Sequence, residues 1–199
     1  MKKTGILCAS DTELEPFLKY IQSPRVTEKA MLKFYSGYIG RTAVVAVYSG
    51  VCKVNAAIAA QLLIDVFDVG CIINAGTAGG MDERVRLFDT VISERMVYHD
   101  VAEDILTEFP ILFGTMVSGE QFIEDEKRSE INRKFAPLSV DMETVSIAHV
   151  CYVNNIPFLS VRTVTDTAEH KGIENFEQNC EVASGRSAQI VIGILEQYS

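Results

Sequence analysis

An apolar segment that ends in hydroxyl groups and a carboxylate places the strongest constraint on the fold of this chain. Residues 156–161 are short and largely apolar, with two asparagines before them and polar side chains after them, which is typical of a buried strand. The segment then continues into Thr163, Thr165 and Asp166. In open α/β sheets, ligands bind in the crevice outside the carboxyl ends of the strands. Asp166 is therefore a candidate for chemistry, although a lone Asp in this position more often caps a turn.

Expected strands and helices alternate along the rest of the chain. This alternation predicts an α/β domain in three layers, with a central mixed, bent β-sheet flanked by helices. A length of 199 residues suits a single domain, residues 1–199, with a proper hydrophobic core. The expected strands are residues 4–9, 33–38, 42–48, 70–73, 85–96, 111–117 and 156–161, and the expected helices run to about residue 20, over 53–67, over 125–134, onward from 143, and over 173–198.

Composition excludes several classes of protein. No apolar run approaches the roughly eighteen residues that a membrane helix needs, and the apolar stretch at residues 6–9 is too short for a signal peptide, so a cytoplasmic location is expected. Five cysteines without a C-x-x-C pair predict reduced thiols, with neither disulfides nor zinc. A formal charge of −9 disfavours nucleic acid or anionic lipid as the main partner. A small neutral or cationic ligand suits the chain better.

Two further strand ends carry acids. Residues 4–9 run into a cluster that includes Glu13, and a short strand after residue 138 ends at Glu143. Acids favour the first turn of a helix through the helix dipole, so the first cluster also has a purely structural explanation. Strand ends from distant sequence positions can nevertheless converge at one edge of a sheet. Together, Glu13, Glu143 and Asp166 therefore indicate a site.

A glycine-rich segment, residues 74–80, follows the strand expected at 70–73. It predicts a turn that lets a ligand approach the backbone, although a tight turn without a ligand fits it as well. The segment lacks the G-x-G-x-x-G spacing and precedes a strand-like stretch rather than a helix. A dinucleotide site is therefore disfavoured, and no cofactor is predicted.

With these motifs, the chain resembles the nucleoside phosphorylase and nucleosidase superfamily, most closely its methylthioadenosine/S-adenosylhomocysteine nucleosidase branch. The matching blocks keep the family order and extend over nearly the whole chain. They are residues 9–13, 49–57, 74–80, 118–123, 140–143, 147–151 and 161–168. The resemblance implies a homodimer that hydrolyses the bond between adenine and the ribose of a 5′-thio-substituted adenosine.

The resemblance also implies roles for individual residues. Asp166 would pass a proton to N7 of adenine, Glu13 would take a proton from the attacking water, and Glu143 would accept hydrogen bonds from the ribose hydroxyls. The other implied substrate-binding residues are Met142 beneath the sugar, Phe122 stacked on the purine, Gln121 and Ile123 at the purine edge through their backbone, Arg162 and Thr165 holding the water and the acid, Phe176 closing over the substrate, and Val51, Thr77, Ala78 and Gly79 in the matching blocks. Met142 and Arg162 also fit purely structural roles.

Two other functions stay open. A purine nucleoside phosphorylase of this superfamily would hold phosphate with arginines, at positions where this chain has residues 9–13 and Asn74. A non-catalytic nucleoside-binding relative would not need both a proton donor and a water-activating base. Two departures from the family pattern stand out: Cys52 replaces a usual glycine, and residues 101–117 form a short connection where the family carries a helix and long loops.

Overall fold

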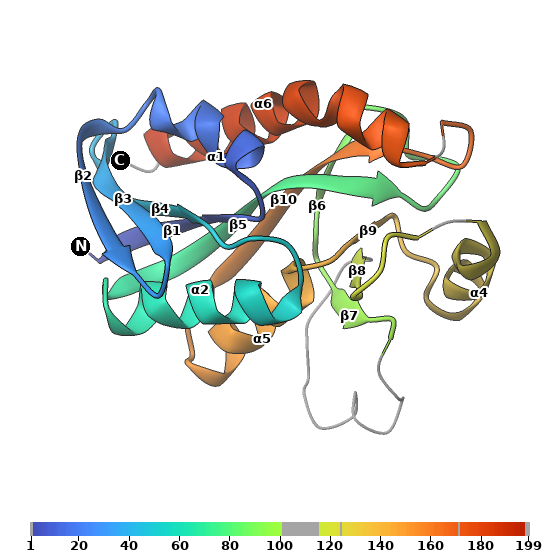
Figure 1. The fold of residues 1–199 in the computed structure, drawn as a ribbon, viewed down its shortest axis with the longest axis horizontal. Helices are drawn as coiled ribbons and strands as arrows, with labels where there is room; N and C mark the ends of the chain where they lie inside the picture. The colour runs from blue at the N-terminus through green and yellow to red at the C-terminus, as the bar shows by residue number, and fades with distance from the viewer. Residues whose placement is uncertain (1, 101–115, 124, 171, 198–199) are drawn as a thin grey trace.

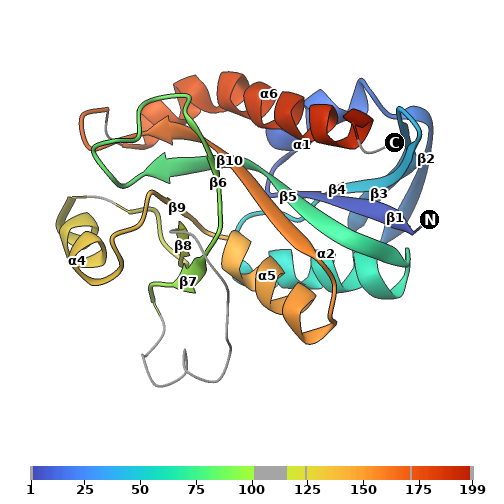
Figure 2. The ribbon, with the colours of Figure 1, turned by 180° about the vertical axis from the view of Figure 1, so that it is seen from behind.

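The computed structural model describes residues 2–100, 116–123, 125–170 and 172–197. Within them, a mixed sheet lies between two layers of helices, which confirms the predicted architecture (Figure 1). One face is covered by α1 (Asp11–Leu18) and α6 (Ile173–Gln197), and the other by α2 (Lys53–Asp65) and α5 (Thr144–Val153) (Figures 1 and 2). The remaining helix, α4 (Asp125–Phe135), lies at one end of the molecule.

Parallel strands form the centre of the sheet. In this centre, β5 (Val69–Gly80) pairs in parallel with β1 (Lys3–Cys8) and with β10 (Phe158–Asp166), and β1 pairs in parallel with β4 (Thr42–Tyr48). The predicted hairpin joins β3 (Leu32–Ile39) to β4 through Gly40, which has a φ of 58°. Four short strands complete the far side: β6 (Thr90–Ile92), β7 (Met96–Tyr98), β8 (Met116–Ser118) and β9 (Ser139–Asp141). The carboxyl ends of β1, β5 and β10 therefore point the same way.

The glycine-rich segment at residues 74–80 is not the predicted turn. Instead, β5 continues to Gly80; it pairs with β10 as far as Gly79 and with β9 at Gly79 and Gly80. A Cβ atom on Gly76 would collide with Glu13 Oε1 and Arg162 Nη1. The glycine thus provides space for two charged side chains rather than a change of chain direction.

Two predicted strands differ from the structure or lie largely outside the described residues, and one further strand was not predicted. The strand predicted over residues 85–96 is wrong in part, because turns precede two separate short strands, β6 and β7. The strand predicted over 111–117 lies largely outside the described residues, and its last two residues belong to β8. An additional edge strand, β2 (Gln22–Lys29), is exposed along its whole length. Since β2 buries no face, its sequence has no apolar alternation to reveal it.

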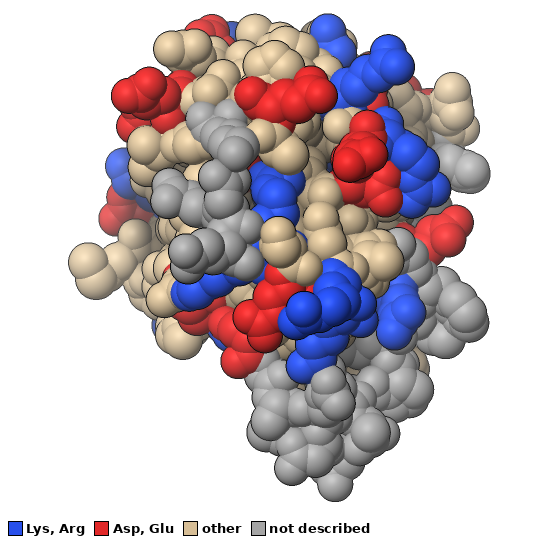
Figure 3. All heavy atoms as spheres, turned by 90° about the vertical axis from the view of Figure 1, so that its right-hand side faces the viewer, with Lys and Arg blue, Asp and Glu red and all other residues tan. Residues whose placement is uncertain are grey.

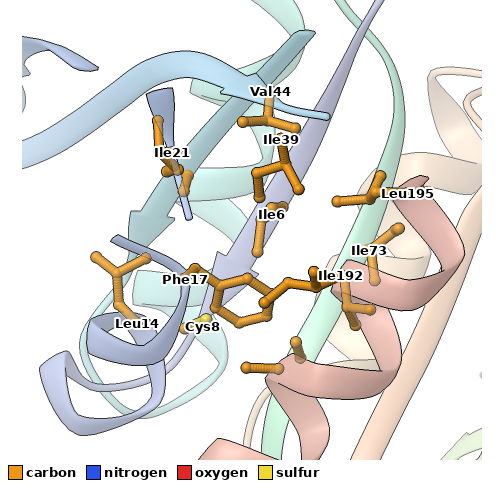
Figure 4. Close-up of a cluster of buried hydrophobic side chains, with 14 of the residues drawn as sticks. Ile6, Cys8, Leu14, Phe17, Ile21, Ile39, Val44, Ile73, Ile192 and Leu195 are labelled. Atoms are coloured by element: carbon orange, nitrogen blue, oxygen red, sulfur yellow. The ribbon is translucent and has the colours of Figure 1, made fainter. Parts of the chain in front are cut away.

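Hydrophobic clusters on both faces hold β1 in place. Ile6 packs with Phe17 and Leu195 between the sheet and the α1/α6 layer (Figure 4), whereas its neighbour Leu7 packs with Leu63 beneath α2. Successive strand residues point to opposite faces, so β1 contributes to both clusters. Each such side chain contributes roughly 1.5–3 kcal/mol on burial. The end of β1, and the residues that follow it, are thereby fixed.

Two further expectations concern membrane-spanning helices and the state of the cysteines. None of the helices in the described ranges is long and apolar enough to cross a membrane. All five cysteines are free thiols, as predicted.

Candidate active site

A buried guanidinium lies at the centre of the candidate site. Arg162 in β10 is fully buried. Its Nη2 lies 2.7 Å from Asp141 Oδ2 and 3.7 Å from Glu143 Oε2, and its Nη1 lies 3.6 Å from Glu13 Oε1. Nη2 also donates to Asn74 Oδ1 at 2.8 Å. Burying an ion costs several kcal/mol unless partners compensate it, so these groups allow a cation to lie inside the fold.

Glu13 is held through both of its carboxylate oxygens. Oε2 accepts hydrogen bonds from the backbone N–H groups of Ala9 at 2.7 Å and Ser10 at 3.3 Å. Oε1 accepts from the backbone N–H of Thr77 at 2.8 Å and from its hydroxyl at 2.9 Å. The Ser10 hydroxyl accepts in return from the Glu13 N–H, which completes a capping box at the start of α1. Glu13 therefore both caps helix α1 and lies in the candidate site beside Arg162.

Glu143 follows β9 and is almost fully buried. Its Oε1 accepts a hydrogen bond from the backbone N–H of Cys52 at 2.8 Å. Burial, followed by the negative charge of Asp141, raises the pKa of Glu143 to about 8, while the positive charge of Arg162 opposes this increase. Burial thus favours the protonated form of Glu143.

Asp141 is a site residue that the sequence analysis did not single out. It accepts hydrogen bonds from the hydroxyls of Ser118 and Thr144, besides its ion pair with Arg162. One available indication was its position two residues before Glu143, since alternate residues of an extended segment share a side.

Asp166 ends β10 and is 3% exposed. Its Oδ1 accepts a hydrogen bond from the Thr165 hydroxyl at 2.9 Å, and its Oδ2 lies 4.0 Å from Arg128 Nη2. Burial raises the pKa of Asp166, whereas the Thr165 hydrogen bond and the Arg128 charge lower it. A carboxyl group whose pKa is raised by burial can hold a proton that a ligand could accept.

Two aromatic rings meet at the edge of this site. Phe122, in the loop before α4, is 38% exposed, and its ring centroid lies 6.3 Å from that of Phe176 in α6 at an interplanar angle of 74°. The Ile123 side chain is buried in the core beneath α4. The Gln121 side chain is exposed and accepts a hydrogen bond from Lys127.

The predicted site residues thus fall into three groups of contacting residues and four further positions, of which Gln121 and Ile123 are described above. Glu13, Glu143, Arg162 and Thr77 form the first group; Asp166, Thr165, Ala78 and Gly79 form the second; and Phe122 with Phe176 forms the third. Met142 is half-buried and Val51 is 49% exposed. The described residues contain no group of three or more His, Cys, Asp or Glu side chains that could hold a metal ion.

A chain of polar contacts ties the loop before α2 to the site. Lys53 Nζ lies 2.8 Å from Asp100 Oδ2, which accepts the backbone N–H of Glu120 at 3.0 Å. The backbone N–H of Lys53 donates to Glu120 Oε1 at 3.1 Å. This loop therefore keeps a fixed position next to Glu143.

On the α4 side of the molecule, cationic and anionic side chains intermingle on the surface (Figure 3).

Cys52 has a backbone conformation that favours glycine. Its φ is 84° and its ψ is 159°, a combination that is essentially restricted to glycine and costs other residues about 1–3 kcal/mol. The same residue supplies the N–H that binds Glu143. The cysteine at this position is therefore accommodated with backbone strain.

We expect Cys52→Gly to raise the free energy of unfolding by about 1 kcal/mol. Relief of the strain exceeds the extra entropy that glycine gives the unfolded chain, which is about 0.5–1 kcal/mol. Urea unfolding monitored by circular dichroism measures the change. Cys52→Ala is the matched control, because it removes the thiol and keeps the strain. Equal stability of the two variants would contradict this account.

Comparison with known proteins places the chain in a family. The model of the Phosphorylase superfamily matches the chain over residues 3–111 and 102–196. The chain is 32% identical to a 5′-methylthioadenosine/S-adenosylhomocysteine nucleosidase of Pseudoalteromonas translucida, over 97% of this chain and 96% of the relative. It is also 32% identical to the nucleosidase of that name from Staphylococcus aureus, over 97% of this chain and 99% of the relative. The three-layer fold with its buried carboxylates is thus that of the phosphorylase superfamily.

Within this superfamily, the chain belongs to the 5′-methylthioadenosine/S-adenosylhomocysteine nucleosidase family. Solved structures agree. The nucleosidase of S. pneumoniae with the transition-state inhibitor MT-ImmA has a TM-score of 0.92 at 26% identity, covering 99% of this chain and 100% of that chain. The nucleosidase of Colwellia psychrerythraea in complex with adenine has a TM-score of 0.91 at 28% identity, covering 98% and 95%.

The comparisons also bear on the short connection noted in the sequence. The alignment with the P. translucida relative extends over 226 positions, more than the 199 residues of this chain, so the relative has residues that this chain lacks. The two segments of the family match meet at residues 102–111.

Proposed function

We propose that the protein hydrolyses the N-glycosidic bond of 5′-methylthioadenosine, S-adenosylhomocysteine and similar adenine nucleosides, and releases adenine. The observation that carries this proposal is a set of three buried acids around the carboxyl-terminal part of β5. Glu13 accepts hydrogen bonds from Thr77, Glu143 shares the Arg162 guanidinium with Glu13, and Asp166 pairs with Gly79. The names of the relatives support it, as does the adenine bound by the Colwellia protein.

The purine leaves with the help of Asp166. The bond between C1′ of the ribose and N9 of adenine breaks, and its electron pair moves into the purine. Asp166 gives its proton to N7, so the base departs as neutral adenine. The exposed face of Phe122 stacks on the purine, and Thr165 keeps the carboxyl group oriented through its hydrogen bond.

The sugar is attacked by water as positive charge develops on the ring. Glu13 takes a proton from this water, and the water oxygen bonds to C1′ of the ribose. Glu143 binds the ribose hydroxyls, and these hydrogen bonds strengthen as the ring becomes positive. Arg162 holds both acids in place through its contacts at 3.6 and 3.7 Å.

Hydrolysis is favoured over phosphorolysis by the charges in the site. A phosphate dianion in a cleft needs fixed cations. Arg162 is already surrounded by Glu13, Asp141 and Glu143. Asn74, at a position where phosphorylases carry an arginine, donates to the Leu7 carbonyl at 2.8 Å and accepts from Arg162. Water therefore suits this site better than phosphate.

We expect adenine to be released from methylthioadenosine in phosphate-free buffer, at a rate that added phosphate does not raise. Adenine and the sugar product are separated by chromatography, with and without phosphate. A strict requirement for phosphate, with a sugar 1-phosphate as product, would assign the protein to the phosphorylases. Release from no nucleoside tested would favour the non-catalytic alternative.

We expect Asp166→Asn and Glu13→Gln each to abolish turnover in a folded protein that still binds ligand. Each substitution keeps the shape of the side chain and removes a proton-transfer group. Glu13→Gln should also cost about 1–3 kcal/mol of stability, because its amide nitrogen must face a backbone donor. Single-turnover assays measure the loss of turnover, and calorimetry with adenine measures the binding that remains. Near-normal turnover by Asp166→Asn would disprove the assigned proton donor.

We also propose a relaxed choice of 5′ substituent, a homodimer and a cytoplasmic location. The shortened connection should remove apolar contacts from the 5′ end, whereas Phe122, Glu143 and Asp166 keep the purine and ribose contacts.

The proposed dimer is supported by two exposed apolar side chains, Val51 just before α2 and Val54 in its first turn. Free thiols support the cytoplasm, which cell fractionation checks.

We expect methylthioadenosine, S-adenosylhomocysteine and 5′-deoxyadenosine to differ less in kcat/KM here than with full-length relatives. Apolar contacts discriminate by only about 1–3 kcal/mol per methylene-sized group, so losing them relaxes selectivity without changing the reaction. Kinetics on the three substrates, with the subunit number measured by sedimentation, test this. Strong preference for one 5′-thio substrate would show that residues 101–113 or a partner subunit rebuild the pocket wall.

A further inference from the structure

A second buried arginine lies beside the candidate proton donor. Arg128, in α4, is 9% exposed, and its Nη2 is 4.0 Å from Asp166 Oδ2. Charge-assisted hydrogen bonds are shorter, at about 2.7–2.9 Å. The guanidinium therefore acts on the carboxyl group through its charge and leaves Oδ2 available for a proton.

The position of Arg128 is set by the backbone. Its Nη1 donates a hydrogen bond to the carbonyl oxygen of Gly80 at the end of β5. One turn later on the same helix, Asn132 Nδ2 donates to the Met81 carbonyl at 2.9 Å. Ile131, also in α4, packs in the core cluster that includes Ile123 from the loop next to Phe122. The helix thereby connects the predicted purine-binding loop to the end of the strand beside Asp166.

We propose that Arg128 is a positioning residue that sets the acid strength of Asp166 during glycosidic bond cleavage. This proposal rests on the proposed function, in which Asp166 protonates N7. Among the described residues, Arg128 is the charged group that acts on the Asp166 carboxyl, and Thr165 is its neutral hydrogen-bond donor. Nothing in the sequence pattern or the family resemblance assigns Arg128 a role.

The direction of the effect follows from electrostatics. An arginine in a protein does not lose its proton, so the charge is permanent. A positive charge beside a carboxyl group favours the ionised form. Burial opposes this and keeps the proton on Asp166 up to a higher pH. Arg128 thus makes Asp166 a stronger acid, which helps it to release the proton to N7 and stabilises the carboxylate that remains.

The test is the pH dependence of kcat/KM for methylthioadenosine in Arg128→Gln. Glutamine can still donate to Gly80 but lacks the charge. We expect the alkaline limb of the profile to move up by about one pH unit or more, because opposite charges at this range shift a pKa by about 1–3 units. The maximal kcat should fall several-fold, because Asp166 becomes a weaker acid. Arg128→Lys should restore the wild-type limb.

Asn132→Ala provides a matched control for structural damage. It removes a similar contact from α4 to the backbone, without a charge near Asp166. We expect it to lower stability and to leave the alkaline limb in place. A limb that stays unchanged in Arg128→Gln, or that moves equally in Asn132→Ala, would overturn the proposal.

A second measurement separates this proposal from the proposed function. The Asp166 carboxyl is titrated by NMR in protein labelled with ¹³C-aspartate, using Asp166→Asn to assign the signal. An Asp166 pKa that rises in Arg128→Gln supports the electrostatic role even if the wild type releases no adenine, a result that would reject the proposed function alone. An unchanged pKa would reject the role of Arg128. If Arg128→Gln does not fold, the same titration of Arg128→Met decides.

Discussion

The whole site depends on the burial of one cation among three anions. Arg162 contacts Glu13 from the start of α1, Asp141 from β9 and Glu143 from the start of α5. These segments are remote in sequence, and the guanidinium is the shared contact of their carboxylates. A buried ion pair adds little net stability, but removing one partner leaves uncompensated charge and costs about 3–5 kcal/mol. The arrangement is therefore all-or-none, which suits a site that must keep its geometry without a ligand.

The imbalance of charge has a chemical consequence. Burial of three carboxylates around one positive charge favours protonation within the cluster. Burial, followed by the negative charge of Asp141, raises the pKa of Glu143, so the effect falls on this group. In the proposed mechanism, a proton on Glu143 would let it donate as well as accept hydrogen bonds with the ribose hydroxyls.

The sequence allowed prediction of the strand-end acids but not of the contacts between them. Glu13, Glu143 and Asp166 follow apolar runs, and such runs are visible in a single sequence. Asp141, Asn74 and Arg128 gain their roles from tertiary contacts, which leave no periodic pattern. The segment at residues 74–80 resembled a turn because glycine usually marks one, whereas here the glycines make room for Glu13, Arg162 and Asp166. The exposed strand β2 lacked the apolar alternation on which strand prediction relies.

The capping box at Ser10 makes the first helix part of the chemistry. The Glu13 carboxylate that accepts the backbone N–H of the N-cap residue Ser10 also accepts hydrogen bonds from Thr77 on β5. In the proposed mechanism, one side chain therefore both caps α1 and activates the water. Docking of α1 onto the sheet and assembly of the site are consequently a single event. A chain in which α1 detaches, even with the rest of the sheet intact, would retain most of its structure and none of its base. Catalytic activity is thus a direct reporter of local folding at the amino terminus.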